Sequence, residues 1–203
     1  MNAGLVVFSL FAGFVCGSIP FGYLAGLINH LDIRKKGSGN IGFTNVQRIL
    51  GWKWAVPVLI LDIAKGVVPV VFARGFGLLP AAVGLGAILG HTFTPYLKFS
   101  GGKGVATSIG VAAVLCPRSL FPSVFVLLLI LLITGFVSLS SLGFSLSLPL
   151  LTLIFYQGNP ILLIFTLCIT ILLIIRHIPN IKRLLTGSEP RFGLWLKLFA
   201  KTK

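Results

Sequence analysis

The chain has 203 residues, of which 56% are hydrophobic and 10% charged, and its mean hydropathy is +1.05. A soluble domain carries about a quarter charged residues, so this composition excludes a soluble or disordered chain and places most of it in lipid. The 17 Lys and Arg residues against three acids give a net charge of +14. In a membrane protein the positive-inside rule explains most of this excess; the surplus requires an anionic partner, either lipid headgroups or a substrate, and no nucleic acid is expected.

The apolar runs predict an all-α integral membrane protein. In chain order, the expected spans are Leu5–Ile28, Trp52–Phe72, Leu78–Leu97, Val105–Cys116, Leu120–Val137, Ser141–Tyr156 and Ile161–Ile175. Several are shorter than the roughly 20 residues that a perpendicular helix needs, so short tilted or half-length helices are expected. Val105–Cys116 is the shortest and fits a buried helix that its neighbours shield from lipid. We therefore predict a seven-transmembrane-helix bundle, with six helices as the alternative.

The cations between these spans predict the orientation. With seven spans, one side of the membrane receives the 29–53 loop, the 98–104 loop and the C-terminal tail, which hold most of the Lys and Arg residues, whereas the other side receives only Arg74 and Arg118. The positive-inside rule then places the C-terminus in the cytoplasm and the N-terminus outside. The first span has no basic residue before it, so we expect it to be retained rather than cleaved as a signal. The prediction is a multi-pass protein of the bacterial cytoplasmic (inner) membrane.

We expect one membrane domain over residues 1–192, followed by an amphipathic basic tail over residues 193–203. The apolar residues of the tail fall on one helical face: Leu194, Trp195, Leu198 and Phe199. Its lysines lie largely beside or opposite that face: Lys197, Lys201 and Lys203. This pattern is typical of a helix that lies on anionic lipid at the membrane surface.

Polar residues concentrate in three segments on the predicted cytoplasmic side, and the first is Gly37–Arg48. Its glycines let the backbone turn tightly and point N–H groups inward, as an anion-binding nest requires. Its arginine adds a planar fork suited to phosphate. The candidate binding residues are Ser38, Gly39, Asn40, Thr44, Asn45 and Arg48. An ordinary connector is the alternative, but the density of hydrogen-bond donors favours a binding site.

The second segment runs from His91 to Gly104 and opens an apolar helix. A glycine loop that enters a helix N-terminus offers free N–H groups and the positive end of the helix dipole to an anion, and Lys103 would add a full charge. The loop is not a Walker A motif, because Leu97 and Gly104 occupy the places of its first Gly and its Ser/Thr, so nucleotide hydrolysis is not expected. The candidates in this segment are His91, Gly101, Gly102 and Lys103. A snorkelling interfacial lysine in a flexible turn is the alternative for Lys103.

The third segment follows the last apolar run and contains Arg176, His177 and Asn180. If the helix continues, His177 and Asn180 point the same way because they are three residues apart, although Pro179 lies between them. Both are candidates for the chemistry. For Arg176 and Arg183, a plain membrane anchor at the helix end is favoured over a role in binding.

Two other features have structural explanations. Asp62 and Lys65 are three residues apart inside the second span, and a structural ion pair is favoured over a functional one. His91 and His177 make a poor metal site, because no nearby carboxylate or thiolate completes the ligand set. No metal and no other cofactor is expected.

The three segments resemble the signature motifs of the bacterial acyl-phosphate:glycerol-3-phosphate acyltransferases, the PlsY family. The matching stretches are Gly37–Arg48 (Gly-Ser-Gly-Asn, then Thr-Asn-Val and Arg), Gly90–Thr107 (Gly-His, then Phe-x-Gly-Gly-Lys-Gly-Val-Ala-Thr) and Arg176–Glu189 (Arg-His, Asn-Ile, Arg-Leu-Leu-x-Gly-x-Glu). Their order and spacing are specific, and the resemblance covers the chain nearly end to end. The departures are Phe43, where a small Ala is expected, and the tail, which is longer. Phe43 is expected to change the packing under the first loop.

The resemblance implies a seven-helix membrane enzyme with its active site at the cytoplasmic face. Such an enzyme transfers a fatty acyl group from acyl phosphate to the 1-hydroxyl of sn-glycerol 3-phosphate. The products are 1-acyl-sn-glycerol 3-phosphate (lysophosphatidic acid) and phosphate, in the first acylation step of bacterial phospholipid synthesis. The implied partners are these two substrates, membrane lipids and the enzyme that produces acyl phosphate.

The residues fit that chemistry, because both substrates are phosphates and the three segments are basic and rich in donors. We expect Lys103 to serve the phosphate whose charge changes in the transition state, and His177 and Asn180 to orient glycerol 3-phosphate. Ser38 has no base beside it in the sequence, so direct attack is preferred to a covalent intermediate.

We expect the departing phosphate to take the proton of the attacking hydroxyl, with His177 as the alternative base. The three acids, Asp32, Asp62 and Glu189, have cations nearby and should be held ionised as weak bases. A membrane transporter of a phosphate-containing anion is the alternative function. It predicts charges at midplane depth in several helices, whereas the charges here gather at one face.

Overall fold

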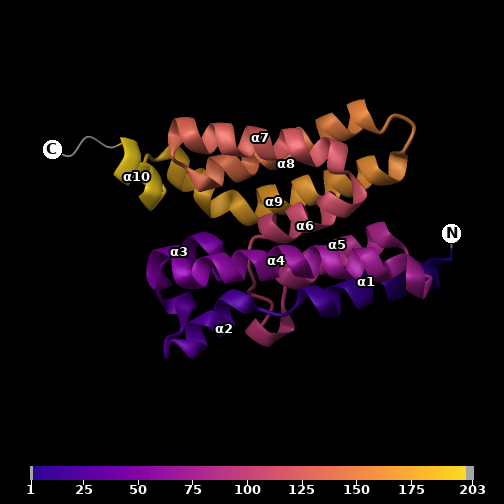
Figure 1. The fold of residues 1–203 in the computed structure, drawn as a ribbon, viewed down its shortest axis with the longest axis horizontal. Helices are drawn as coiled ribbons and strands as arrows, with labels where there is room; N and C mark the ends of the chain where they lie inside the picture. The colour runs from indigo at the N-terminus through magenta and orange to yellow at the C-terminus, as the bar shows by residue number, and fades with distance from the viewer. Residues whose placement is uncertain (1, 200–203) are drawn as a thin grey trace. The chain divides into compact units, whose positions relative to one another are not determined.

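The structure, a computed structural model, describes residues 2–199, with side chains up to Leu196. In this part of the chain all regular structure is helical. The α-helices are α1 (Ala3–Gly17), α2 (Phe21–Ile28), α3 (Phe43–Leu50), α4 (Trp52–Ala73), α5 (Pro80–Thr92), α6 (Val105–Leu115), α7 (Pro117–Thr134), α8 (Val137–Phe155), α9 (Pro160–Leu185) and α10 (Gly193–Phe199). The 3-10 turns are η1 (Ile33–Lys35), η2 (Arg74–Phe76) and η3 (Pro95–Leu97). The chain divides into two compact units, Met1–Leu115 and Cys116–Lys203, each with its own packing (Figure 1).

Five helical segments within residues 2–199 are long and apolar enough to cross a membrane. They are Ala3–Ile28, Trp52–Phe76, Pro117–Thr134, Val137–Phe155 and Pro160–Leu185. The other two predicted spans form α5 and α6, which have only 13 and 11 residues. At about 1.5 Å per residue these helices are about 20 Å and about 16 Å long, shorter than a hydrocarbon core of about 30 Å. The all-helical membrane class is confirmed, whereas the count of seven and the orientation stay predictions.

In the first unit, α1 and α5 lie side by side (Figure 1) with their backbones in close contact. Glycines four residues apart form this contact, Gly13 and Gly17 on α1 and Gly86 and Gly90 on α5. A Cβ at any of these positions would collide with a backbone carbonyl of the facing helix. Small residues at this spacing let apolar helices approach closely in lipid, where burial supplies no driving force between them. The contact fixes the end of α5 that carries His91.

The first predicted span, Leu5–Ile28, corresponds to the apolar segment Ala3–Ile28, but the structure adds a break at Pro20 that separates α1 from α2. Two side chains from distant parts of the unit satisfy the backbone at this break. Thr94 Oγ1 donates to the carbonyl of Ser18 at 2.6 Å, and Lys65 Nζ donates to the carbonyl of Ile19 at 2.8 Å. Non-helical backbone at membrane depth requires such protein partners, since lipid offers none.

In the second unit, α8 lies beside both α7 and α9 (Figure 1). Gly135 ends α7 in the left-handed region, with a φ of 74°, and its N–H donates to the carbonyl of Leu131 at 2.9 Å. Thr170 Oγ1 of α9 donates to the carbonyl of Ser145 of α8 at 2.6 Å, which ties these two helices together. The tie holds α9, which carries the third polar segment, against α8.

Helix α10 packs on the end of α7. Trp195 Nε1 donates to the carbonyl of Leu132 at 2.8 Å, and its ring covers Gly135, where no Cβ would fit. The guanidinium of Arg191 lies 4.7 Å from the Trp195 ring centre. The tail therefore contacts protein, which the sequence did not predict, and its place on lipid stays a prediction. Some of the tail residues on which that prediction depends have side chains outside the described part of the chain: Lys197, Leu198, Phe199, Lys201 and Lys203.

Candidate active site

One buried side chain, Asn45, shapes the loop between η1 and α3. Its Nδ2 donates to the carbonyls of Ile33, Lys36 and Asn40 at 3.3, 3.1 and 2.8 Å, and its Oδ1 accepts from the N–H of Ser38 at 2.9 Å. Asn45 is 1% exposed, and all these partners belong to the backbone of the loop. The structure thus gives Asn45 a loop-shaping role, and its predicted contact with substrate stays a prediction.

The remaining candidates of this segment differ in accessibility. Ser38 and Arg48 are exposed and Thr44 is half-buried. Gly39 adopts a φ of 72°, a left-handed conformation that glycine allows at no steric cost. Asn40 Oδ1 accepts from the backbone N–H two residues later at 2.7 Å, a turn that leads into α3. Ser38, Thr44 and Arg48 are therefore the side chains of this segment best placed to meet a ligand.

Arg34, next to this loop, is held by Asp32. Its Nε and Nη2 lie 2.9 and 2.8 Å from the two carboxylate oxygens, and its guanidinium lies 4.7 Å from the ring centre of Tyr23. The hydrogen bond from Arg34 lowers the pKa of Asp32 to about 2. The prediction that cations hold this acid ionised is confirmed.

The second segment folds back on the end of α5. The N–H groups of Gly101 and Gly102 donate to the carbonyls of Thr92 and His91, both at 3.0 Å. They therefore cap α5, a correction to the prediction that they are free donors for an anion. Close approach explains the glycines, because a Cβ on Gly101 would collide with the carbonyl oxygen of His91, and one on Gly102 with its ring.

Lys103 and the start of α6 stay the candidate donors for an anion in this segment. Lys103 is half-buried and lies two residues before the first residue of the helix. The first backbone N–H groups of an α-helix have no acceptor within the helix, and the ladder of α6 starts with Ser108, whose N–H donates to the carbonyl of Gly104 at 2.8 Å. The positive charge and the helix N-terminus thus coincide, as the sequence predicted.

A buried ionic cluster lies against this loop. Lys65 Nζ is 2.8 Å from Asp62 Oδ1, which confirms the predicted ion pair, and His91 Nδ1 is 3.5 Å from the same oxygen. The three residues are 2–6% exposed. Within residues 2–199, no three His, Cys, Asp or Glu side chains gather as metal ligands.

The first two segments share one hydrophobic core within the first unit. Leu97 of η3 is buried in the same cluster as Ile41 and Val46 from the first segment. Phe43 packs partly against this cluster, and its ring meets that of Trp52 edge to face at 5.9 Å. The fold therefore brings these two segments together, and Phe43 contributes to the packing under the loop as predicted.

The third segment lies on α9 in the second unit. The helix continues through Pro179, so His177 and Asn180 keep their helical spacing, and they are 2% and 6% exposed. His177 Nδ1 lies 2.8 Å from the carbonyl oxygen of Leu173. Because a carbonyl only accepts, Nδ1 of His177 carries a proton in this contact.

The sequence did not predict that Glu189 orients Asn180. Asn180 Nδ2 donates to one carboxylate oxygen of Glu189 and Arg183 Nε to the other, each at 2.6 Å. Burial raises the pKa of Glu189, but hydrogen bonds from Asn180, Ser138 and Arg183 and the charge of Arg183 outweigh it and hold the pKa below its usual value. The prediction that Glu189 is held ionised is confirmed. The sequence held one signal for this contact, because a lone acid such as Glu189 in a basic segment indicates that the acid has a specific partner.

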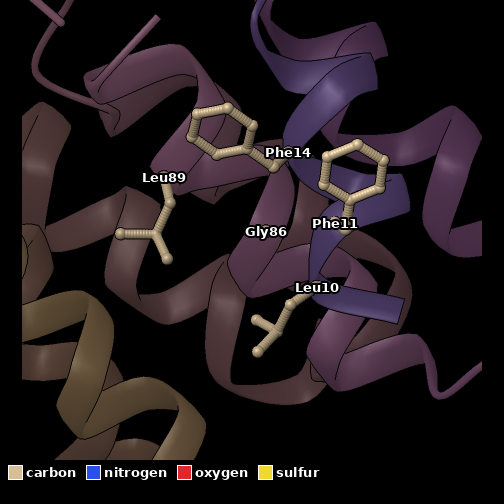
Figure 2. A pocket seen from close by; sticks show the side chains of 5 residues that line it. All are labelled: Leu10, Phe11, Phe14, Gly86 and Leu89. Atoms are coloured by element: carbon tan, nitrogen blue, oxygen red, sulfur yellow. The ribbon is translucent and has the colours of Figure 1, made fainter. Parts of the chain in front are cut away.

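An apolar groove lies on the first unit between α1 and α5 (Figure 2). Its lining residues are Leu10, Phe11, Phe14, Gly86 and Leu89. No polar side chain lines it, so it suits hydrocarbon and not phosphate. Leu89 precedes His91 by two residues on α5, which places this apolar surface next to the second polar segment.

Residues 7–187 match the family model described as glycerol-3-phosphate acyltransferase. The chain belongs to this family. A glycerol-3-phosphate acyltransferase of Leptospira borgpetersenii serovar Hardjo-bovis (strain JB197) is 44% identical over 90% of this chain and 90% of its own. One from Trichlorobacter lovleyi is 40% identical over 95% of this chain and 99% of its own.

Crystal structures of PlsY (YgiH), an integral membrane glycerol 3-phosphate acyltransferase, have the same fold. Its glycerol 3-phosphate form has a TM-score of 0.87 and 39% identity, covering 96% of this chain and 98% of that chain. Its lysophosphatidic acid form has a TM-score of 0.85 and 38% identity, with the same coverage. This member of the acyltransferase family is therefore a multi-pass membrane enzyme of phospholipid synthesis, and the resemblance of its three polar segments to the PlsY family is confirmed.

Proposed function

We propose that this acyltransferase transfers a fatty acyl group from acyl phosphate to the 1-hydroxyl of sn-glycerol 3-phosphate, giving lysophosphatidic acid and phosphate. The observation that carries the proposal is the family match over residues 7–187, a range that holds Lys103, His177 and Asn180. The donor is proposed because no motif for CoA, carrier protein or nucleotide occurs in the sequence. An anion transporter, the alternative function, has no support in this family membership.

The membrane arrangement is part of the proposal. The chain crosses the bacterial inner membrane seven times, with α1 and α2 forming one crossing together and α4 to α9 the others. The N-terminus is outside, and the active site faces the cytoplasm with most of the cations. Residues 1–192 form one membrane domain, and residues 193–203 rest on anionic lipid. The partner that supplies the donor is the enzyme that produces acyl phosphate, and no cofactor or metal takes part.

The phosphate groups are bound by the first unit. Lys103 and the start of α6 hold the phosphate whose charge changes during the reaction. Ser38, Thr44 and Arg48 supply neutral donors and a guanidinium fork from the other loop of the same unit. This assignment of donors to the two loops is supported by the buried core that the loops share, because a shared core keeps their donors at a fixed separation.

The reaction is a direct displacement. The hydroxyl oxygen of glycerol 3-phosphate attacks the acyl carbonyl carbon, a new ester C–O bond forms, and the C–O bond to phosphate breaks. The departing phosphate takes the hydroxyl proton. Acyl phosphate is an activated mixed anhydride, so no covalent enzyme intermediate is needed. His177 and Asn180 orient the glycerol part of the acceptor, and the hydrogen bond from Asn180 to Glu189 fixes the direction of that amide.

The test is incubation of the purified protein, in detergent micelles, with palmitoyl phosphate and glycerol 3-phosphate. Lysophosphatidic acid and phosphate should appear in equal amounts without CoA, carrier protein, nucleotide or added metal. Parallel reactions contain palmitoyl-CoA in place of the donor, or EDTA. Full activity with palmitoyl-CoA, or complete loss in EDTA that added metal restores, contradicts the proposal.

A further inference from the structure

The cluster of Asp62, Lys65 and His91 has no part in the reaction as described above, yet it occupies the interior of the first unit. Lys65 Nζ contacts Asp62 Oδ1 and the carbonyl of Ile19, each at 2.8 Å, and lies 5.4 Å from the ring centre of Phe21. The lysine is therefore anchored at the break between α1 and α2, and its charge neutralises that of Asp62. A buried ion pair alone contributes little net stability, because desolvation offsets the attraction.

The third member, His91, connects the ion pair to the glycine loop. Its Nδ1 faces Asp62 Oδ1 at 3.5 Å, and the Nε2 side of its ring lies against Gly102. A carboxylate only accepts hydrogen bonds, so Asp62 favours a proton on Nδ1, the ring nitrogen that faces it. The ring is thus oriented from one side by a carboxylate, while the glycine loop lies on the other side.

The glycine loop rests on the same residue through its backbone. The N–H of Gly102 donates to the carbonyl of His91, and that of Gly101 to the carbonyl of Thr92, both at 3.0 Å. The contact between the His91 ring and Gly102 is so close that a Cβ on Gly102 would collide with the ring. A rotation of the ring would therefore displace Gly102. The next residue in the chain is Lys103.

We propose that Asp62 is a positioning residue that acts through His91: it fixes the ring that supports the 101–104 loop and thereby places Lys103 at the start of α6. Lys65 neutralises the buried carboxylate. The inference rests on the proposed role of Lys103 in binding phosphate. It differs from the structural interpretation of the ion pair, which assigns the pair to stability alone.

Two double variants separate these interpretations. Asp62→Asn/Lys65→Met removes both charges but keeps an oxygen that can accept from His91 Nδ1. Asp62→Leu/Lys65→Met removes the charges and the acceptor. Neither variant leaves a charge buried at these two positions, so the comparison isolates the acceptor at residue 62. His91→Phe, which keeps a ring without nitrogens, is the second route to the same perturbation if the Leu/Met variant does not fold.

We expect kcat/KM for glycerol 3-phosphate to be at least about tenfold lower in the Leu/Met variant than in the Asn/Met variant, because a displacement near 1 Å at a reacting group has effects of this size. The gap should close when Lys103→Ala is added to both, since residues that act through one another are not additive. Equal activity of the two variants, or a gap that persists in the Lys103→Ala background, overturns the inference.

Hydrogen exchange without substrate gives an independent readout. The amides of Gly101 and Gly102 should exchange faster in the Leu/Met variant than in the Asn/Met variant, while peptides of α7 and α8 exchange alike. Identical exchange in the loop overturns the inference even if activity differs. If the wild-type protein makes no lysophosphatidic acid, the proposed function fails, and the exchange difference still decides the positioning role.

Discussion

Replacing Glu189 by Ala should destabilise the protein by about 2 kcal/mol and weaken acceptor binding. The carboxylate accepts from Asn180 and Arg183, each at 2.6 Å. Asn180 is 6% exposed, so water cannot readily replace the lost acceptor, which costs about 1–3 kcal/mol. The Arg183 side chain is 39% exposed and regains water, so its share is below about 1 kcal/mol. The buried hydrogen bond therefore dominates.

The sign of the pH dependence follows from the lowered pKa of Glu189. A carboxyl whose pKa is lower in the folded state contributes its full stability above the unfolded pKa, about 4.3 for Glu. This contribution disappears as the pH falls through the folded pKa. The difference in stability between wild type and Glu189→Ala should thus be constant between about pH 6 and 8 and shrink below about pH 4.

Denaturation in detergent micelles at several pH values, together with steady-state kinetics, measures both effects. Glu189→Ala should raise KM for glycerol 3-phosphate, because the Asn180 amide loses the contact that fixes its direction. Arg183→Ala is the matched control, since it removes only the exposed partner. If Arg183→Ala destabilises the protein as much as Glu189→Ala, the exposed ion pair carries the effect and the reasoning is refuted.

Lys103→Ala should slow turnover by about two to three orders of magnitude with an unchanged melting temperature; near-normal turnover would make it a snorkelling residue. His177→Gln should raise KM for glycerol 3-phosphate and keep the shape of the pH–rate profile, whereas loss of an ionisation near the usual His pKa of about 6.5 would identify His177 as the base. Asn45→Ala should destabilise the protein by about 3 kcal/mol in chemical denaturation, since four hydrogen bonds disappear; Asn45→Asp should lose at least as much, because its second carboxylate oxygen would face the three carbonyl oxygens that Nδ2 now binds. Deleting residues 193–203 should lower the melting temperature and membrane association modestly through loss of the Trp195 contacts, while kcat stays within about twofold of wild type; a truncation as inactive as Lys103→Ala would contradict this.

The sequence predicted where helices occur, because long apolar runs must satisfy their own backbone in lipid. It did not predict the break at Pro20, where the run stays apolar. The donors that stabilise the break, Lys65 and Thr94, are 46 and 76 residues away from the carbonyls they bind. Sequence patterns over a few neighbouring residues do not predict contacts with such distant partners. The same reason explains why the packing of Trp195 on Gly135 was not foreseen.

In the candidate site, too, the sequence predicted the types of residue present but not the contacts that each residue makes. Composition and spacing indicated three donor-rich segments, and the fold brings the first two together around Leu97. The sequence could not tell which donors are used internally. Asn45 and Gly102 were predicted to bind substrate, and the structure shows that their hydrogen bonds shape the protein. Glu189 was predicted only as an acid held ionised by cations, and the structure shows that it also holds Asn180. Which donors face a substrate is decided by tertiary contacts and not by residue type.

The contacts of the three acids favour the leaving phosphate, and not a carboxylate of the protein, as the acceptor of the hydroxyl proton. Asp32, Asp62 and Glu189 each have a cation, at 2.8, 2.8 and 2.6 Å. A carboxylate bound in this way is stabilised as the anion, which makes it a weak base. In the proposed mechanism His177, whose Nδ1 contacts the carbonyl of Leu173, sets the direction of the glycerol hydroxyl without taking its proton. The phosphate that leaves acyl phosphate gains basicity as its bond to carbon breaks, at the moment when the hydroxyl becomes acidic. In the proposed mechanism the substrate therefore supplies the base, and the tasks of the enzyme are to bind two phosphates and to align one hydroxyl.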